Sequence, residues 1–135
     1  MFFKVYDSYL CLNEAQYLRP EAIYQADFSL IIRYNMNFDK EELAKSSIKE
    51  INRYYEVSKK DQESYYKKLV EIFPDVSKGS EIEARYSKKG FVELYYNKAL
   101  TGKIHDSKFS QIFLDIWLYK DSKYPKAIKD LFKNE

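Results

Sequence analysis

Residues able to do chemistry are few in this 135-residue chain, and they are scattered. Cys11 is the single cysteine and His105 the single histidine, so a zinc site or a Ser-His-Asp arrangement has almost nothing to draw on. Cys11 alternates with Leu10 and Leu12 in a strand-like run, which is typical of a buried thiol rather than a nucleophile. We therefore identify no catalytic residue and predict no metal site and no cofactor.

Four residues remain as candidates for holding a ligand: Arg33, Tyr6, Tyr95 and Tyr96. Arg33 lies between apolar neighbours and could bind a carboxylate through two hydrogen bonds. We favour the structural alternative, an Arg on the less covered sheet face that pairs with a helix or hairpin acid. The tyrosines could line an apolar cleft with a hydroxyl turned inward. Tyr95 and Tyr96 are consecutive and must point to opposite faces of a strand, so at most one of them enters any given pocket.

Other polar and aromatic side chains have simpler structural explanations. Asp75 begins an Asp-Val-x-x-Gly segment ending at Gly79, which is ordinary turn chemistry after a helix. Glu41 and Glu42 are adjacent, so they diverge on a helix, and their place in its first turn suits the helix dipole. Trp117 is expected in the core.

Composition favours a globular domain and argues against two function classes. The 23 basic and 21 acidic residues are interspersed, so no basic tract indicates binding to nucleic acid or to an anionic membrane. No apolar stretch reaches the roughly 18 to 20 residues of a membrane span. The start at Met1 lacks the features of a signal peptide, so we expect a cytoplasmic protein or a mature form whose leader was removed. The length fits a single domain over residues 1–135.

Hydrophobic periodicity predicts the order strand, strand, helix, helix, three strands, helix, helix. On the second strand, residues 22–36, the alternation puts one apolar set on a single face: Phe28, Leu30, Ile32, Tyr34 and Met36. The predicted strands are 2–12, 22–36, 81–86, 91–97 and 100–104, and the predicted helices are 39–56, 58–73, 106–119 and 125–132. Because strands come in runs, the class should be α+β with an antiparallel sheet covered by helices on one side.

Three segments resemble a known family. Residues 3–10, FKVYDSYL, resemble the first strand of bacterial chalcone-isomerase-like proteins, and residues 72–79, IFPDVSKG, resemble their "FPDVKKGD" turn. Residues 93–97, ELYYN, followed by GKI at 102–104, Phe109 and FLDIWL at 113–118, resemble a third family segment. The resemblance implies an open-faced β-sandwich, in which a curved antiparallel sheet has helices packed on one face.

The same resemblance implies where catalytic residues would stand. In the plant enzymes a chalcone cyclises by intramolecular addition of a phenolate to an enone, with an Arg stabilising the enolate and hydroxyl groups holding a water. The strand for that Arg would precede Met1. The remaining positions fall on residues that match poorly. The Thr position falls at or before Met1 or Phe2. The Tyr position falls near Glu42 or Leu43, the Asn position near Lys49 or Glu50, and the hydroxyl position of the late helix at Ser110. We therefore do not expect chalcone cyclisation.

Three hypotheses for function follow. The first is non-catalytic binding of a small apolar or fatty-acid-like ligand, since relatives in this superfamily bind fatty acids and the aromatic content is 18%. The second is an isomerase or lyase acting on an unsaturated carbonyl compound. The third is a structural or interaction module without a ligand. Bacterial members of the family often carry a leader, which implies a periplasmic or secreted protein if a leader was removed.

Overall fold

The computed structural model describes residues 6–12 and 20–118, with side chains described for residues 23–118. Five strands form one antiparallel sheet in the order β1-β2-β3-β4-β5. The elements in chain order are β1 (Tyr6–Leu12), η1 (Pro20–Gln25), β2 (Phe28–Tyr34), α1 (Lys40–Tyr54), α2 (Lys59–Ile72), β3 (Glu81–Ser87), β4 (Phe91–Tyr96), β5 (Ala99–Ile104) and α3 (Ser107–Leu118).

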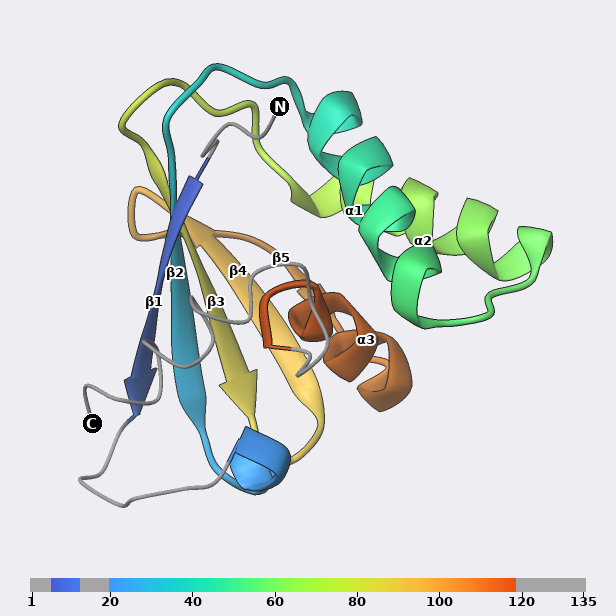
Figure 1. Cartoon of the computed structure of the whole chain (residues 1–135). Helices are drawn as coiled ribbons and strands as arrows, with labels where there is room; N and C mark the ends of the chain where they lie inside the picture. The colour runs from blue at the N-terminus through green and yellow to red at the C-terminus, as the bar shows by residue number, and fades with distance from the viewer. Residues whose placement is uncertain (1–5, 13–19, 119–135) are drawn as a thin grey trace.

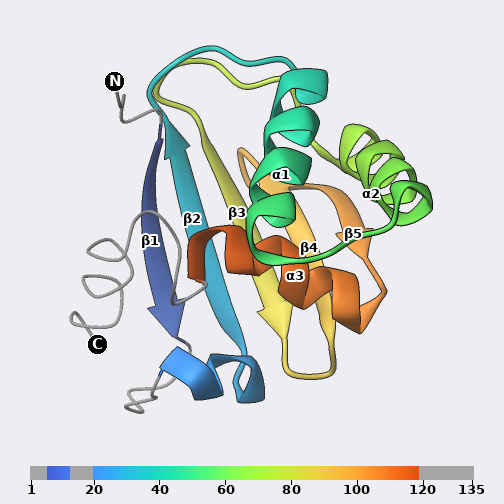
Figure 2. The ribbon, with the colours of Figure 1, turned by 45° about the vertical axis from the view of Figure 1, so that its right-hand side comes forward.

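All three α-helices lie on the same side of the sheet. Figure 1 shows α3 in front of β4 and β5, with α1 and α2 farther out on that side, and Figure 2 shows α1 running down across the sheet. The other face of the sheet carries no helix of the described chain in either view. The predicted α+β class, with helices on one face of an antiparallel sheet, is confirmed.

The alternation along β2 explains which face the helices cover. Phe28, Leu30, Ile32 and Tyr34 are buried, while Arg33 between the last two is exposed. Strand β3 repeats the pattern, with its buried residues paired in register with those of β2. Alternate side chains point to opposite faces of a strand, so the sheet has one apolar face under the helices and one polar, open face.

Local signals in the sequence determine where the first two helices begin. The Asp39 side chain accepts from the Glu42 N–H and the Glu42 side chain accepts from the Asp39 N–H, the capping box expected from the sequence. Ser58 caps α2 through a bond from the Asp61 N–H. Asp75 accepts from the Lys40 N–H, and so it ties the segment after α2 to the first turn of α1. This confirms that Asp75 is a structural turn residue.

The close approach of α2 to the sheet depends on Gly102. A Cβ at this position would lie 2.2 Å from Cγ2 of Ile72, far inside van der Waals contact. Gly102 pairs with Leu94 in the sheet, and Ile72 is buried at the end of α2. The missing side chain therefore lets the helix pack directly on β5.

The predicted strand over residues 22–36 is wrong at both ends. Its first residues belong to the 3-10 helix η1, because Pro20 suits a helical first turn and the Ala26 N–H donates to the Ile23 carbonyl. Met36 lies beyond the end of β2 and is 48% exposed, so it does not join the apolar face. The predicted residues 2–5 of the first strand, Tyr119 and the last helix at 125–132 lie outside the described residues.

Candidate functional site

Arg33 lies on the open face of the sheet and is paired with an acid. Its Nη2 atom is 2.8 Å and its Nε atom 3.0 Å from Oε2 of Glu81, which stands opposite it on β3. The two side chains are 49% and 42% exposed. The structural alternative favoured for Arg33, a pair with an acid on the less covered face, is confirmed.

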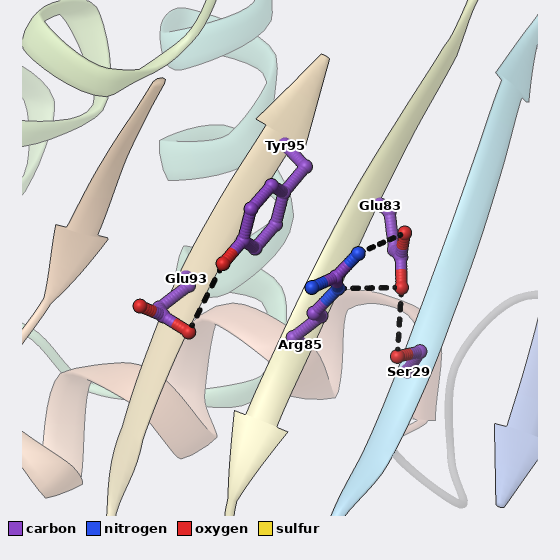
Figure 3. Close-up of polar contacts among 5 residues, drawn as sticks. All are labelled: Ser29, Glu83, Arg85, Glu93 and Tyr95. Carbon is purple, nitrogen blue, oxygen red and sulfur yellow. Dashed lines mark hydrogen bonds and ion pairs between the residues drawn. The ribbon is translucent and has the colours of Figure 1, made fainter. Parts of the chain in front are cut away.

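Tyr95 belongs to a second polar group on the same face, shown in Figure 3. Glu83 accepts from Ser29 at 3.0 Å and from Arg85 at 2.9 Å, and the hydrogen bond from Arg85 is the main cause that lowers the pKa of Glu83. The Arg85 guanidinium lies 3.9 Å from the centre of the Tyr95 ring, and the Tyr95 hydroxyl is 3.4 Å from Glu93. These side chains make their hydrogen bonds and their cation–π contact with one another on the open face of the sheet.

The other two predicted ligand-binding tyrosines are placed differently. Tyr96 pairs with Ile82 on the helix-covered face, where it is half-buried against the core, so Tyr95 and Tyr96 do point to opposite faces. Tyr6 pairs in register with Tyr34 on β2, and its side chain lies outside the described residues. The structure does not bring Arg33 and Tyr95 into one pocket with Tyr96. A ligand role for these residues stays a prediction.

A cluster of titratable groups not foreseen from the sequence lies under the helices. The carboxyl group of Asp115, on α3, accepts a hydrogen bond from the Tyr24 hydroxyl of η1 at 2.6 Å. Its other oxygen accepts from the hydroxyl of Tyr55, the residue that caps the end of α1. The Tyr24 hydroxyl also lies 3.1 Å from the carbonyl oxygen of Gln111. We call Tyr24, Tyr55 and Asp115 the phenol–carboxylate cluster; it joins three elements.

The surroundings of this cluster are apolar and aromatic. The Tyr24 ring contacts Tyr86 edge to face at 5.2 Å between centroids and lies 6.0 Å from Phe28. No Lys or Arg forms an ion pair with Asp115 in the part of the chain that the structure describes. Burial raises the pKa of Asp115, and the two tyrosine hydroxyls oppose this shift by stabilising its charge. Burial, with the charge of Asp115 second, raises the pKa of Tyr24 far above its usual value.

Tyr34 is a second unusual phenol on the helix-covered face. It is 5% exposed, and its ring contacts Phe38 edge to face at 6.1 Å between centroids. Burial raises its pKa. Tyr34 and Tyr24 lie toward opposite ends of β2.

An open hollow of about 580 Å³ lies at the turn between α1 and α2. Its lining is mainly polar and includes Tyr55 of the phenol–carboxylate cluster. Inside it, Asn52 donates to the Gln62 side chain at 3.1 Å, and Gln62 donates to the Val57 carbonyl at 2.8 Å. These bonds fix the turn, so we assign the hollow a structural role.

Three of the positions that the resemblance assigns to catalytic residues serve the fold, and Met1 and Phe2 lie outside the described residues. Glu42 completes the cap of α1, and Leu43 is a buried core residue. Ser110 is fully buried, and its hydroxyl donates to the carbonyl oxygens of Asp106 and Ile104, at 2.8 and 3.2 Å. Among the described residues no three His, Cys, Asp or Glu side chains gather as a metal site would require. No described helix has the length and hydropathy of a membrane span.

The phenol–carboxylate cluster was missed because its members are far apart in sequence. The pairs Tyr24–Asp115 and Tyr55–Asp115 are separated by 91 and 60 positions. One signal was available: Asp115 is the single charged residue in the apolar run from Ile112 to Leu118. An acid on the buried side of a helix needs a partner, which is a reason to search for one.

Comparisons with known proteins agree with this architecture. The chain matches the chalcone isomerase-like family over residues 1–131. Among solved structures it is similar to a fatty-acid binding protein of Arabidopsis thaliana, with a TM-score of 0.59 and 11% sequence identity. The match covers 85% of this chain and 60% of that protein, so the chain spans less than two thirds of its neighbour. No curated protein sequence matches the chain. With its fold and this match over nearly the whole length, the chain belongs to the chalcone isomerase-like family.

Proposed function

We propose that this protein binds a small apolar ligand, of fatty-acid size and character, without transforming it. The observation that supports this most is the likeness of its fold to that of a fatty-acid binding protein. One fold hosts many activities, so the likeness suggests the class of ligand and does not identify the molecule.

The helix-covered face of the sheet offers a suitable surface. Among the described residues every strand side chain on that face from β2 to β4 is apolar or aromatic: Phe28, Leu30, Ile32, Tyr34, Ile82, Ala84, Tyr86, Val92, Leu94 and Tyr96. The polar groups of these side chains are the hydroxyl groups of Tyr34, Tyr86 and Tyr96. Apolar walls with a few polar groups to orient the ligand are typical of small-molecule sites.

A non-catalytic role fits the arrangement of the groups that could do chemistry. Arg33, next to the end of β2, pairs with Glu81 on the opposite side of the sheet from the helices. The Ser110 hydroxyl is engaged by two backbone carbonyls. Cyclisation of an enone needs preorganised donors at the developing enolate, and these residues do not supply them.

Native mass spectrometry of freshly purified protein, followed by solvent extraction, tests the proposal. We expect a discrete adduct of lipid mass that is released by the solvent and is retained in an Arg33→Ala variant. A clean mass of the protein alone, unchanged after incubation with fatty acids and flavonoids, would rule the proposal out.

One observation favours a second candidate, a structural or interaction module. The described core side chains between sheet and helices are at most 7% exposed, as in a layer filled by the protein's own residues. Under this alternative no apolar compound would bind in the mass spectrometry experiment.

A further inference from the structure

The helices α1 and α2 form a helical hairpin whose two ends meet at one place. Phe38, just before α1, and Val76, after α2, exchange two backbone hydrogen bonds of 3.0 and 2.8 Å. The Asp75 carboxylate accepts a further hydrogen bond from the Lys40 N–H at 2.9 Å, which joins the same two ends. Figure 2 shows the chain entering α1 and leaving α2 along loops that lie side by side. The helical hairpin, residues 39–75, is therefore connected to the sheet along the chain at one end.

The helical hairpin is the least buried part of the helix layer. Four of the 15 residues of α1 and two of the 14 residues of α2 are buried, against eight of the 12 residues of α3. Helix α3 is also tied to the sheet, because the Ser110 hydroxyl donates to the carbonyl oxygen of Ile104, the last residue of β5, at 3.2 Å. Segments with few buried side chains open at a lower free energy than the rest of a protein. The helical hairpin is thus the part of the layer that separates from the sheet at the lowest cost.

A hydrogen bond holds the far end of the helical hairpin against α3. Tyr55, at the end of α1, donates to the carboxylate of Asp115. Tyr55 also lines the open hollow at the turn between α1 and α2, so it lies at the border between the core and solvent. If Tyr55 moved away, Asp115 would keep the hydrogen bond from Tyr24 at 2.6 Å, and water in the hollow could accept from Tyr55. Breaking this bond therefore leaves neither group without a partner.

The face of the sheet that would hold the proposed ligand is closed to solvent. Ile32, Ile82 and Leu94 on this face are at most 1% exposed. Protein interiors are packed so closely that they hold few voids larger than a water molecule. A ligand of fatty-acid size can therefore reach this face only if the helices and the sheet move apart.

We propose that the helical hairpin is a lid, which turns about the Phe38–Val76 pair and is latched by the hydrogen bond from Tyr55 to Asp115, and that its opening admits the ligand to the covered face of the sheet. The role in ligand entry rests on the proposed function, whereas the opening itself requires no ligand.

The contacts along α2 fit a rotation about this end. Ile72, the last residue of α2, packs against Gly102 of β5 close to the pivot, so this contact moves least. Tyr65, farther from the pivot, stacks on Phe109 of α3 with 3.9 Å between ring centroids. Opening would separate these two rings together with the Tyr55 latch.

Thiol modification in Ser47→Cys and Ser110→Cys measures the opening without any ligand. Both serines are buried and donate to backbone carbonyls, so the two variants make the same chemical change in matched surroundings. Ser47, Ile51 and the cap residue Tyr55 follow one another at a spacing of four, so Ser47 lies on the side of α1 that faces α3, whereas Ser110 faces β5. With iodoacetamide at pH 8, and peptide mass spectrometry to resolve each site, the thiol of Ser47→Cys should react at least about tenfold faster than that of Ser110→Cys.

Two further substitutions distinguish opening of the lid from unfolding of the whole protein. Tyr55→Phe keeps the ring and removes the latch, so it should speed modification of Ser47→Cys roughly 10- to 100-fold, the effect of one hydrogen bond to a charged acceptor. Val92→Ala creates a cavity at a fully buried residue of β4 that pairs with Ile104 of β5. It should speed modification of Ser110→Cys and leave that of Ser47→Cys unchanged.

Three results would overturn the inference. They are equal rates for the two serine variants, an equal acceleration of both by Val92→Ala, and an unchanged rate for Ser47→Cys when Tyr55→Phe is added. The first two would mean that the helices leave the sheet only when the whole protein unfolds. If a serine variant does not fold, Ile51→Cys and Leu114→Cys report on the same two regions, since both residues are buried and lie one helical turn farther along α1 and α3.

Stopped-flow binding of a dansyl-labelled undecanoic acid tests the role of the lid in ligand entry. Tyr55→Phe should raise its association rate by about the same factor as the rate of thiol modification. Tyr95→Phe, which removes a hydroxyl on the open face, is the matched control and should leave the association rate unchanged. An association rate that Tyr55→Phe does not change would refute entry through the lid. If wild type does not bind the probe while the thiol rates are as expected, the proposed function fails and the opening stands.

Discussion

Removal of the Tyr24 hydroxyl is the sharpest perturbation of the phenol–carboxylate cluster. In Tyr24→Phe the ring keeps its contacts with Phe28 and Tyr86, and only the oxygen 2.6 Å from Asp115 is lost. A hydrogen bond to a charged group contributes about 1.5–3 kcal/mol, against about 0.5–1.5 kcal/mol for a neutral pair. We expect Tyr24→Phe to lower the free energy of unfolding by about 1.5–3 kcal/mol where Asp115 is ionised.

The pH dependence of this loss follows from the raised pKa of Asp115. Because burial raises that pKa above its value in the unfolded chain, the folded protein binds the proton more tightly. The corresponding stability is present below the unfolded-state pKa and is lost as pH rises through the folded-state pKa. Tyr24 stabilises the ionised form, so the cost of Tyr24→Phe should be larger above the folded-state pKa than below it.

Urea unfolding of a double-mutant cycle measures the interaction. The cycle uses wild type, Tyr24→Phe, Asp115→Ala and the double variant, followed by circular dichroism at several pH values. In the Asp115→Ala background, Tyr24→Phe should cost much less than in wild type. Tyr95→Phe serves as control and should change stability by no more than about 0.5 kcal/mol. Equal costs of Tyr24→Phe in both backgrounds would refute the assigned bond.

Three further predictions concern other contacts. Asp115→Asn keeps the shape of the neutral acid and should remove the fall in stability with rising pH. If urea unfolding at several pH values shows a fall of unchanged size in this variant, the assignment to Asp115 is contradicted. Gly102→Ala should cost about 1–3 kcal/mol or more through its clash with Ile72, and less in an Ile72→Ala background, by urea unfolding; an equal cost in both backgrounds would contradict the close packing. Arg33→Ala should change stability by less than about 1 kcal/mol, because the pair with Glu81 is exposed; a larger loss in thermal unfolding would mean that Arg33 supports more than this pair.

Much of the fold was predictable where local signals and tertiary packing agree. The alternation from Phe28 to Tyr34 is a period-two pattern, and the same residues are buried in the sheet. The capping box of Asp39 and Glu42 correctly predicted where α1 begins. In η1, Ile23 and Tyr24 have side chains that favour strands. Pro20, however, favours a turn, and the Asp27 carboxylate, just after η1, accepts a hydrogen bond from the Lys88 N–H. There the tertiary contacts decided the local structure.

The candidate site was harder to predict because it depends on long-range contacts. Arg33 was correctly expected to pair with an acid, because an arginine on the open face of a sheet can reach an acid on the neighbouring strand. Asp115 meets Tyr24 and Tyr55 only once α3 packs beneath α1 and beside η1.

The central claim is that an apolar ligand is held between the sheet and the helices. Methyl-labelled NMR with methyl dodecanoate tests it most directly, by nuclear Overhauser contacts from the ligand chain to Ile32, Ile82 and Leu94 on the covered face. Ile31, on the opposite face of β2, is the internal control. We expect contacts to the covered methyl groups and none to Ile31. Contacts confined to Ile31, or no contacts at saturating ligand, would contradict it.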